Sequence, residues 1–309
     1  MRDYVILCDG ACDLPLELRE RFGIADYLPG NITKPDGTTI VQDIDWKNMS
    51  PADFYGSMSK KSIYRTSITS LANQKEFFEK YLSQGYEILN LSVSTGLSGT
   101  YANCLTAAKE LKDKYPDQRI ICIDTLRYAG AIAILASIAG EMKKEGKTLD
   151  EAAKWVEDTK HKIHQIGTVD DLSFLKAMGR ITGVAAFMGN LVGIKPLAEV
   201  NRKGENQVIA KTKGYNGLYE LVVEYIKRMA DDIANQRIVI SYTNRKAQAL
   251  KIKELIEENF HPKEILMLVV SQTCGASIGP GMVNVFFMGP ETSEGLAEET
   301  RILNEIMGK

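Results

Sequence analysis

Apolar side chains in the first half of the chain alternate between runs of strand length and runs with helical spacing. Short, nearly continuous apolar runs predict strands at Tyr4–Asp9, Glu87–Val93 and Arg119–Asp124. Apolar positions three and four residues apart predict helices around them. These helices are expected at Leu16–Phe22, Pro51–Lys60, Leu71–Ser83, Ser98–Lys114 and Ala129–Lys144. Strands that alternate with helices in this way indicate a parallel sheet covered by helices.

A hairpin interrupts this alternation near the N-terminus. Ala25–Thr33 and Thr38–Gln42 have the composition of strands and flank a Pro-Asp-Gly turn at 35–37. Further along, Gly146 is expected to end a helix, and the sequence Thr-Leu-Asp-Glu at 148–151 has the pattern of a capping box. We therefore expect a domain boundary at this point, with an N-terminal domain at 1–147 and a C-terminal domain at 148–309.

The second half of the chain has a different order of elements. Strands are expected at Gln165–Val169, Ile194–Val200, Gln207–Thr212, Arg237–Thr243, Glu264–Val270 and Val283–Met288. An Arg-Lys-Gly-Glu segment at 202–205 joins the second and third of these strands as a hairpin. Amphipathic helices are expected at Gly217–Ala234, Lys246–Phe260 and Glu291–Met307. This order predicts an α/β domain with a mixed sheet and helices on one face.

Composition and charge exclude several classes of protein. The chain has 309 residues, a formal net charge of -2, 44% hydrophobic residues and 25% charged residues, which is typical of a soluble protein. No apolar stretch reaches the roughly 18 residues that a membrane span requires, so no stable membrane insertion is expected. Acidic and basic residues nearly balance and no long basic block occurs, which is evidence against nucleic-acid binding.

Cysteine usage and the N-terminus indicate the cellular compartment. Five cysteines without a Cys-x-x-Cys pair indicate a reducing environment and no structural disulfide. Cys8 and Cys12 do not have the spacing of a usual zinc pair. The chain enters a strand directly at Tyr4, which predicts no signal peptide. We therefore expect a cytoplasmic protein without a metal site.

The strongest chemical signal is the hydroxyl-rich turn between the strand that ends at Val93 and the helix that follows. Ser94, Thr95, Ser98 and Thr100 carry its four hydroxyls. A helix N-terminus presents unpaired N–H groups and a partial positive charge, and ligands of open α/β sheets bind at the carboxyl ends of strands. Helix capping by Ser98 would explain only one of these hydroxyls. The turn therefore predicts a site for a phosphate or a carboxylate.

Three further segments carry candidate chemistry, and each also has a purely structural explanation. The hydroxyls of Arg65–Ser70 precede a helix, where Ser70 alone could act as the N-cap. Ala177–Gly183 contains a Gly-Arg turn that presents the guanidinium of Arg180, although a surface arginine at a helix end would look the same. Cys274–Gly281 holds three glycines and a proline, which predicts a rigid loop rather than a plain turn.

Common catalytic motifs are missing from the sequence. Ser98 lacks the second glycine of a G-x-S-x-G elbow, and none of the three histidines has a matching local pattern. The turn also lacks the lysine of a P-loop, and no G-x-G-x-x-G occurs. These absences are evidence against a serine hydrolase and against nucleotide hydrolysis, and no cofactor is expected.

Taken together and in order, these segments resemble the motifs of the DegV family of bacterial fatty-acid-binding proteins. Residues 9–15 resemble that family's S-D-S-x-x-D-L-P turn, and residues 94–101 are nearly its S-S-x-L-S-G-T-Y. The other matching segments are 66–70 (T-S-Q-P-S in the family), 123–125 (V-I-D-S), 171–182 (L-x-x-L-x-x-G-G-R-I-S), 194–196 (I-K-P) and 279–281 (the end of H-T-G-P-G). The resemblance covers nearly the whole chain.

The resemblance implies a fold and a ligand. The fold is an N-terminal α/β/α domain with a parallel sheet and a C-terminal two-layer α/β domain with a mixed sheet, related to dihydroxyacetone-kinase-like proteins. The ligand is one long-chain fatty acid between the domains, with its carboxylate on Ser and Thr hydroxyls and its tail in an apolar tunnel. The site residues expected by position are Thr66, Ser67, Ser94, Thr95, Ser98, Gly99, Arg180 and Ser277. Thr66, Ser94 and Ser98 are the first choices for the carboxylate contacts.

The resemblance also implies a partner. Some family members present the bound acid to a separate fatty acid kinase, and there the loop histidine and the arginine of G-G-R take part. Arg180 is kept here, but Ser277 stands at the histidine position and Met178 replaces the first glycine. A serine cannot become a cationic donor as an imidazole can, so we expect a poor carrier for such a kinase.

Two other functions stay open on the sequence alone. One is a subunit or enzyme that acts on a small phosphorylated or hydroxylated metabolite, and the other is a regulatory lipid sensor. A deep apolar tunnel would favour the lipid, whereas a small polar cavity would favour the metabolite.

Overall fold

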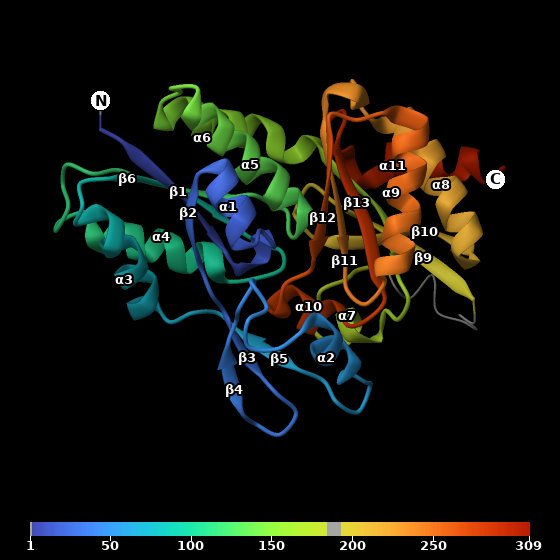
Figure 1. Ribbon diagram of the computed structural model, residues 1–309, viewed down its shortest axis with the longest axis horizontal. Coiled ribbons are helices and arrows are strands. Elements are labelled where there is room, and N and C mark those ends of the chain that lie inside the picture. Colours follow the sequence, from blue (N-terminus) through green and yellow to red (C-terminus); the bar gives the residue numbers. More distant parts are fainter. Residues whose placement is uncertain (1, 184–192) are drawn as a thin grey trace.

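The computed structural model of the protein describes residues 2–183 and 193–309 and contains two larger sheets side by side (Figure 1). The first sheet is parallel, in the order β2-β1-β6-β7. Its strands are β1 (Tyr4–Asp9), β2 (Ile24–Leu28), β6 (Glu87–Ser92) and β7 (Ile120–Asp124). Every residue of β1 and β6 is buried, as expected for a parallel sheet covered on both faces.

Alternate residues of these strands pack against helices on opposite faces of the sheet. Val5, Leu7 and Ile88 point toward α3 (Leu71–Leu82) and α4 (Thr100–Leu111). Ile6 and Leu89 point to the core on the other face. That face is covered by α1 (Leu16–Phe22), α5 (Gly130–Lys144) and α6 (Leu149–Thr159). The predicted α/β/α arrangement of the N-terminal half is therefore confirmed.

The second sheet is mixed, in the order β12-β11-β13-β8. β11 (Arg237–Tyr242) runs parallel to β12 (Glu264–Val269) and antiparallel to β13 (Met282–Met288), which pairs in turn with β8 (Ile163–Val169). One face packs against α8 (Gly214–Met229), α9 (Lys246–Phe260) and α11 (Ala297–Ile306). The hairpin of β9 (Ile194–Val200) and β10 (Asn206–Lys213) lies beside β8. The predicted mixed sheet is therefore confirmed.

Helix α5 covers the other face of the second sheet and lies between the two sheets (Figure 1). Gly130 at its start has no room for a side chain, because a Cβ there would lie 2.6 Å from Cγ1 of Val239 on β11. Gly140 near its end would place a Cβ 1.9 Å from the carbonyl oxygen of Phe22 in α1. Glycine at these two positions lets one helix pack closely against both halves of the protein.

A third, small sheet differs from the predicted hairpin. The expected strand Ala25–Thr33 is divided at Pro29, which has no N–H for a ladder hydrogen bond. Its first part is β2 of the parallel sheet, and its second part is β3 (Asn31–Thr33). β3 pairs with β4 (Thr39–Val41), as the predicted hairpin requires, and also with β5 (Arg65–Ser67), which the pattern did not predict. Helix α2 (Pro51–Gly56) packs beside this sheet.

The glycine-rich segment Cys274–Gly281 was expected to be a loop, but most of it is helical. Helix α10 (Gln272–Ile278) ends at Gly279, which has a φ of +79°. Gly275 permits the helix to contact Tyr55 of α2, since a Cβ there would lie 2.2 Å from the Tyr55 hydroxyl oxygen. The tertiary contact with Tyr55 explains this glycine, which sequence reasoning assigned to a loop. The short helix α7 (Ser173–Ala177) packs against α10.

The predicted capping box is present at the start of α6. The Glu151 N–H donates to Thr148 Oγ1 at 3.2 Å, and the Thr148 N–H donates to Glu151 Oε2 at 2.8 Å. Helix α6 packs against β6 and β7, so this helix covers the first sheet although it follows residue 147. The predicted domain boundary itself stays a prediction. Single 3₁₀ turns lie at Gly10–Cys12, Lys160–Lys162, Ile233–Asn235 and Glu294–Leu296.

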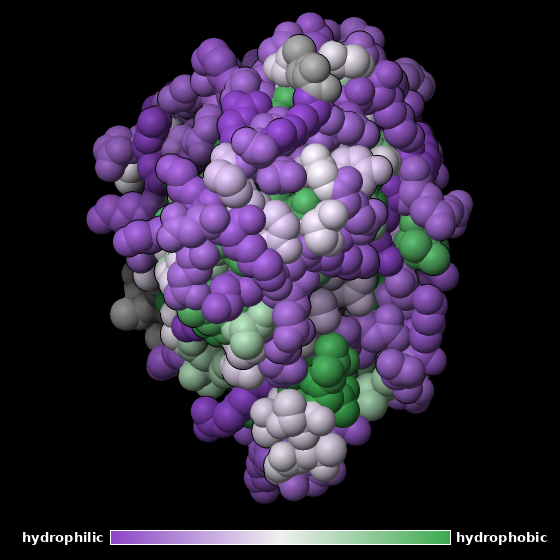
Figure 2. Space-filling model, turned by 90° about the vertical axis from the view of Figure 1, so that its left-hand side faces the viewer, coloured by the Kyte–Doolittle hydropathy of each residue, from purple (hydrophilic) through white to green (hydrophobic). Residues whose placement is uncertain are grey.

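Most of the surface of one side of the molecule is hydrophilic (Figure 2). Hydrophobic side chains gather in its lower part, where the β3–β4 hairpin projects in Figure 1. Val41 of β4 and Ile68, which follows β5, are among the exposed large hydrophobic residues. Within residues 2–183 and 193–309, no helix has both the length and the apolar character needed to cross a lipid bilayer.

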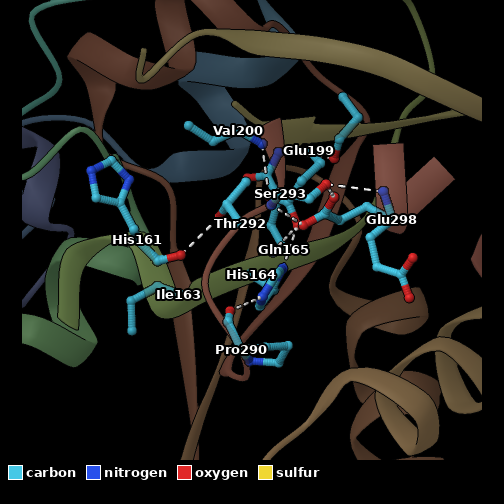
Figure 3. Close-up of polar contacts among 12 residues, drawn as sticks. His161, Ile163, His164, Gln165, Glu199, Val200, Pro290, Thr292, Ser293 and Glu298 are labelled. Atoms are coloured by element: carbon cyan, nitrogen blue, oxygen red, sulfur yellow. Dashed lines mark hydrogen bonds and ion pairs between the residues drawn. The ribbon is translucent and has the colours of Figure 1, made fainter. Parts of the chain in front are cut away.

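A buried ion pair joins the β9–β10 hairpin to the second sheet (Figure 3). His164 of β8 lies with Nδ1 3.3 Å from Glu199 Oε2 and Nε2 2.7 Å from the Pro290 carbonyl oxygen. The Glu199 carboxylate also accepts the backbone N–H groups of Gln165 and Val200. Burial alone lowers the pKa of His164, but the hydrogen bond and charge of Glu199 outweigh it, so the pKa is raised. Two acceptors around one imidazole favour its protonated form.

The ion pair predicts a pH-dependent stability. A raised histidine pKa contributes stability below the unfolded value of about 6.5, and this contribution is lost as pH rises through the folded pKa. In the variant Glu199→Gln the charge is gone and burial lowers the pKa of His164, so its contribution should change sign. We expect the free energy of unfolding to fall more steeply between about pH 6 and pH 8 in the wild type than in Glu199→Gln. Urea unfolding at several pH values measures both slopes. Identical slopes would contradict the prediction, since the other buried acids are common to both proteins.

The close packing of α5 predicts the effect of a single methyl group. Gly140→Ala should destabilise the protein by about 1–3 kcal/mol, because Phe22 backbone must move to admit the new Cβ. Gly56→Ala in α2 is the matched control, since nothing lies within 4 Å of a Cβ there. Urea midpoints of the two variants provide the comparison. Equal midpoints would show that α1 and α5 separate at little cost.

Candidate ligand-binding site

The main cavity lies between the carboxyl ends of the parallel strands and the helices α7 and α10. Its volume is about 170 Å³. The first half contributes the ends of β1, β2 and β5 and the segment before α4, which is where ligands of open α/β sheets bind. The second half contributes Leu175, Arg180, Asn206, Thr273, Cys274, Ser277 and Ile278. The cavity is therefore closed by residues from both halves.

Most of the predicted site residues line this one cavity. They are Thr66 and Ser67 of β5, Ser98 and Gly99 before α4, Arg180 after α7, and Ser277 of α10. Ile68 lines the cavity and is 42% exposed, which places it at the mouth. Tertiary folding thus brings together segments more than two hundred residues apart in the chain.

Ser94 and Thr95 lie outside the residues that line the cavity. Ser94 is fully buried, and its Oγ donates to the Gly204 carbonyl at 2.7 Å and accepts the Gly96 N–H at 3.0 Å. Thr95 is exposed, and its N–H donates to Asp124 Oδ1 at 3.2 Å. Ser94 was a first choice for a carboxylate contact, but in the structure its hydroxyl binds the β9–β10 turn. It fastens the first half of the protein to the second.

Ser98 occupies the approach to a helix N-terminus. Helix α4 begins at Thr100, two residues later than the pattern predicted, with Gly99 as N-cap and no side chain capping it. Ser98 Oγ lies 2.9 Å from Thr100 Oγ1 and accepts the Thr100 N–H at 3.3 Å. Unpaired N–H groups and the partial positive charge of α4 therefore accompany the Ser98 and Thr100 hydroxyls.

The turn after α7 presents a guanidinium, as predicted. Gly179 takes a φ of +64° there, and the Arg180 N–H donates to the Leu175 carbonyl at 2.8 Å, which closes the helix end. Arg180 Nη1 donates to the Met178 carbonyl at 2.7 Å. These bonds hold the arginine at the cavity wall while part of the guanidinium stays available to an anion.

Burial raises the pKa of two groups in the cavity wall. Asp9, at the end of β1, accepts the N–H groups of Ala11 and Val93, but desolvation outweighs these bonds and raises its pKa to about 6. Burial likewise raises the pKa of the Cys274 thiol well above its usual range, so it is not a thiolate at neutral pH. In the part of the chain that the structure describes, no group of three or more His, Cys, Asp or Glu side chains is arranged to hold a metal ion.

Gln74 and Asn103 are among the polar residues of the cavity that sequence reasoning missed. Both lie one turn inside helices, Gln74 in α3 and Asn103 in α4. One signal for Gln74 was available, since it stands four residues before Phe78 on the stripe that α3 buries. A polar residue in an apolar stripe indicates a specific partner or a cavity.

A second, smaller cavity of about 10 Å³ lies next to the first and is lined by residues of the second sheet. Tyr128, Leu175 and Asn206 line both cavities. The wall beyond them includes the apolar side chains of Val169 and Leu172. The two cavities are therefore neighbours that share part of one wall.

Comparisons with known proteins identify relatives over nearly the whole chain. A sequence profile described as "Uncharacterised protein, DegV family" matches residues 3–289. A DegV domain-containing protein of Clostridium perfringens is 36% identical over 289 residues, which cover 94% of this chain and 98% of that protein. Another from Streptococcus pyogenes is 29% identical over 286 residues, or 93% and 98% of the two chains.

Solved structures share the fold at lower identity. A fatty-acid-binding DegV family protein from Thermus thermophilus has a TM-score of 0.83 at 22% identity, over 94% of this chain and 100% of that one. A DegV family protein from Eubacterium eligens loaded with heptadecanoic acid has a TM-score of 0.81 at 19% identity, over 93% and 99%. These similarities confirm the predicted fold class and, together with the profile and the sequence relatives, show that this chain belongs to the DegV family.

Proposed function

We propose that this protein binds a long-chain fatty acid in the cavity between its two halves. The observation that carries the proposal is the composition of that one cavity. Thr66, Ser98 and Arg180 provide donors in one cavity, whose wall also holds apolar side chains such as Leu28, Val93 and Leu97. The DegV family proteins from Thermus thermophilus and Eubacterium eligens, which bind fatty acids, support it.

A fatty acid requires polar donors for its carboxylate and apolar surface for its tail, and the cavity wall contains both. A buried carboxylate needs several donors, since an unpaired charge away from water is costly. Hydroxyls, the uncapped N-terminus of α4 and the Arg180 guanidinium supply such donors. Each CH₂ of the tail that leaves water contributes about 0.8 kcal/mol, so the apolar part of the wall favours a long chain. The protein acts in this proposal as a binding protein and not as a catalyst.

Removing the two hydroxyls should release the ligand. We expect the protein as purified to carry a fatty acid, and Thr66→Ala combined with Ser98→Ala to lower the affinity at least tenfold, because hydrogen bonds to a charged group contribute about 1.5–3 kcal/mol each. Native mass spectrometry followed by organic extraction identifies the ligand and its loss.

The control for this experiment is the pair Ser83→Ala and Thr106→Ala, which removes one serine and one threonine hydroxyl from exposed positions near α3 and on α4. This variant should retain the lipid. A wild-type protein that carries no lipid and also refuses added fatty acids would contradict the proposal and favour a small polar metabolite.

The proposed function includes a role as a carrier that presents the acid to a fatty acid kinase. Arg180 and Ser277 line the same cavity, so both lie within reach of one bound headgroup. Ser277 cannot supply the positive charge of an imidazolium to a phosphoryl group. We therefore expect Ser277→His to increase acyl-phosphate formation with a partner kinase, by about tenfold or more. Phosphate transfer from ATP is the readout. High wild-type activity that the substitution leaves unchanged would contradict this expectation.

A further inference from the structure

One buried donor in the main cavity has no partner. Gln74 is 1% exposed and lines the cavity, and its Nε2 makes no hydrogen bond within the described part of the chain. An amide N–H that is buried without an acceptor destabilises the folded protein, because it has lost its hydrogen bonds to water. A buried donor on a residue that lines a cavity, with no acceptor in the protein, indicates that a ligand supplies the acceptor.

The orientation of the Gln74 amide is set by its neighbours. The Cys104 thiol donates to Gln74 Oε1 at 3.3 Å, and Cys104 Sγ itself accepts from Asn90 Nδ2 and Ser92 Oγ, each at 3.4 Å. Burial raises the pKa of Cys104 to about 12, so the thiol keeps the proton that it donates. With the amide reversed, the sulfur would face three donors and its own proton would lose its acceptor. Nε2 is therefore the amide group of Gln74 that is left without an acceptor.

Gln74 lies in a polar part of the cavity wall, where the first turns of two helices meet. It is one turn inside α3, and its partner Cys104 is one turn inside α4. Asn103 Nδ2 donates to the Thr69 carbonyl at 2.8 Å and joins the starts of the two helices. The Ser98 hydroxyl precedes α4 on the same cavity wall. The N-terminus of α4, the Ser98 hydroxyl and the buried Gln74 N–H form a set of donors for an anion.

We propose that Gln74 is the buried donor that binds the ligand carboxylate and makes this site select a fatty acid over a fatty alcohol. This inference rests on the proposed function and adds to it a residue that lies outside the hydroxyl-rich turns. A carboxylate offers Nε2 a charged acceptor, which strengthens the bond relative to a neutral oxygen. Asp9 cannot take this part, because its carboxylate offers no donor and already accepts two N–H groups.

The test compares dissociation constants for hexadecanoic acid and hexadecanol, measured by displacement of a fluorescent fatty-acid analogue from delipidated protein. Gln74→Met keeps the side-chain length without the donor and should weaken acid binding about tenfold, with a smaller effect on the alcohol. Gln74→Glu places an acceptor where the donor stood. It should lower the acid-to-alcohol selectivity at least tenfold at neutral pH and recover acid affinity as pH falls and the new carboxyl becomes protonated.

The matched control is Gln84→Glu, the same change at an exposed position just after α3, where selectivity should stay at the wild-type value. Gln74→Met is neutral and provides the answer if the buried charge of Gln74→Glu prevents folding. Wild-type binding of hexadecanoic acid with unchanged selectivity in the Gln74 variants would overturn the role of Gln74 and leave the proposed function standing. A wild-type protein that binds neither ligand would overturn both.

Discussion

The packing of α5 against both sheets is the constraint on which the rest of the structure depends. Its residues fill the core of the first sheet on one side and contact β11 and β13 of the second sheet on the other. Gly130 lies against the Val239 and Phe286 side chains of the second sheet, and Gly140 lies against the Phe22 backbone of α1, so glycine at both positions lets α5 pack closely on each side. The cavity forms where α7 and α10 lie opposite the carboxyl ends of the parallel strands.

Polar contacts then fasten the edges of the two halves where loops meet. Ser94 donates to the Gly204 carbonyl, the Ser271 N–H donates to Asp13 Oδ1 at 2.8 Å, and the buried Arg127 donates to the Ile163 carbonyl at 3.0 Å. In each case a side chain of the first half satisfies a backbone group of the second. Buried backbone groups need partners, so these bonds fix the relative position of the halves as well as their stability.

The hydroxyl-rich turn after β6 contains serines with two different roles. The Ser94 hydroxyl donates to the Gly204 carbonyl and joins the two halves, whereas Ser98, four residues later, lines the cavity. Both are serines in the same turn, and only their surroundings separate a structural hydroxyl from one that can meet a ligand. The binding proposal therefore rests on the side chains that share one cavity and not on the motif as a whole.

The sequence by itself determined the order of elements and much of the candidate site. Apolar periodicity predicted the exact bounds of β1, α1 and α9. The strand is buried on both faces and each helix buries one stripe, so their apolar patterns are regular. Turn and cap chemistry, which is local, pointed to Ser98 and Arg180, and the resemblance to DegV motifs pointed to Thr66 and Ser277. Only the tertiary structure decided that Ala25–Thr33 is divided between two sheets, and that Cys274–Gly281 contains a helix packed on Tyr55. It also decided that the Ser94 hydroxyl is hydrogen-bonded to Gly204 and that Gln74 lines the cavity. These outcomes depend on contacts between residues far apart in the chain, which local periodicity and propensity do not encode.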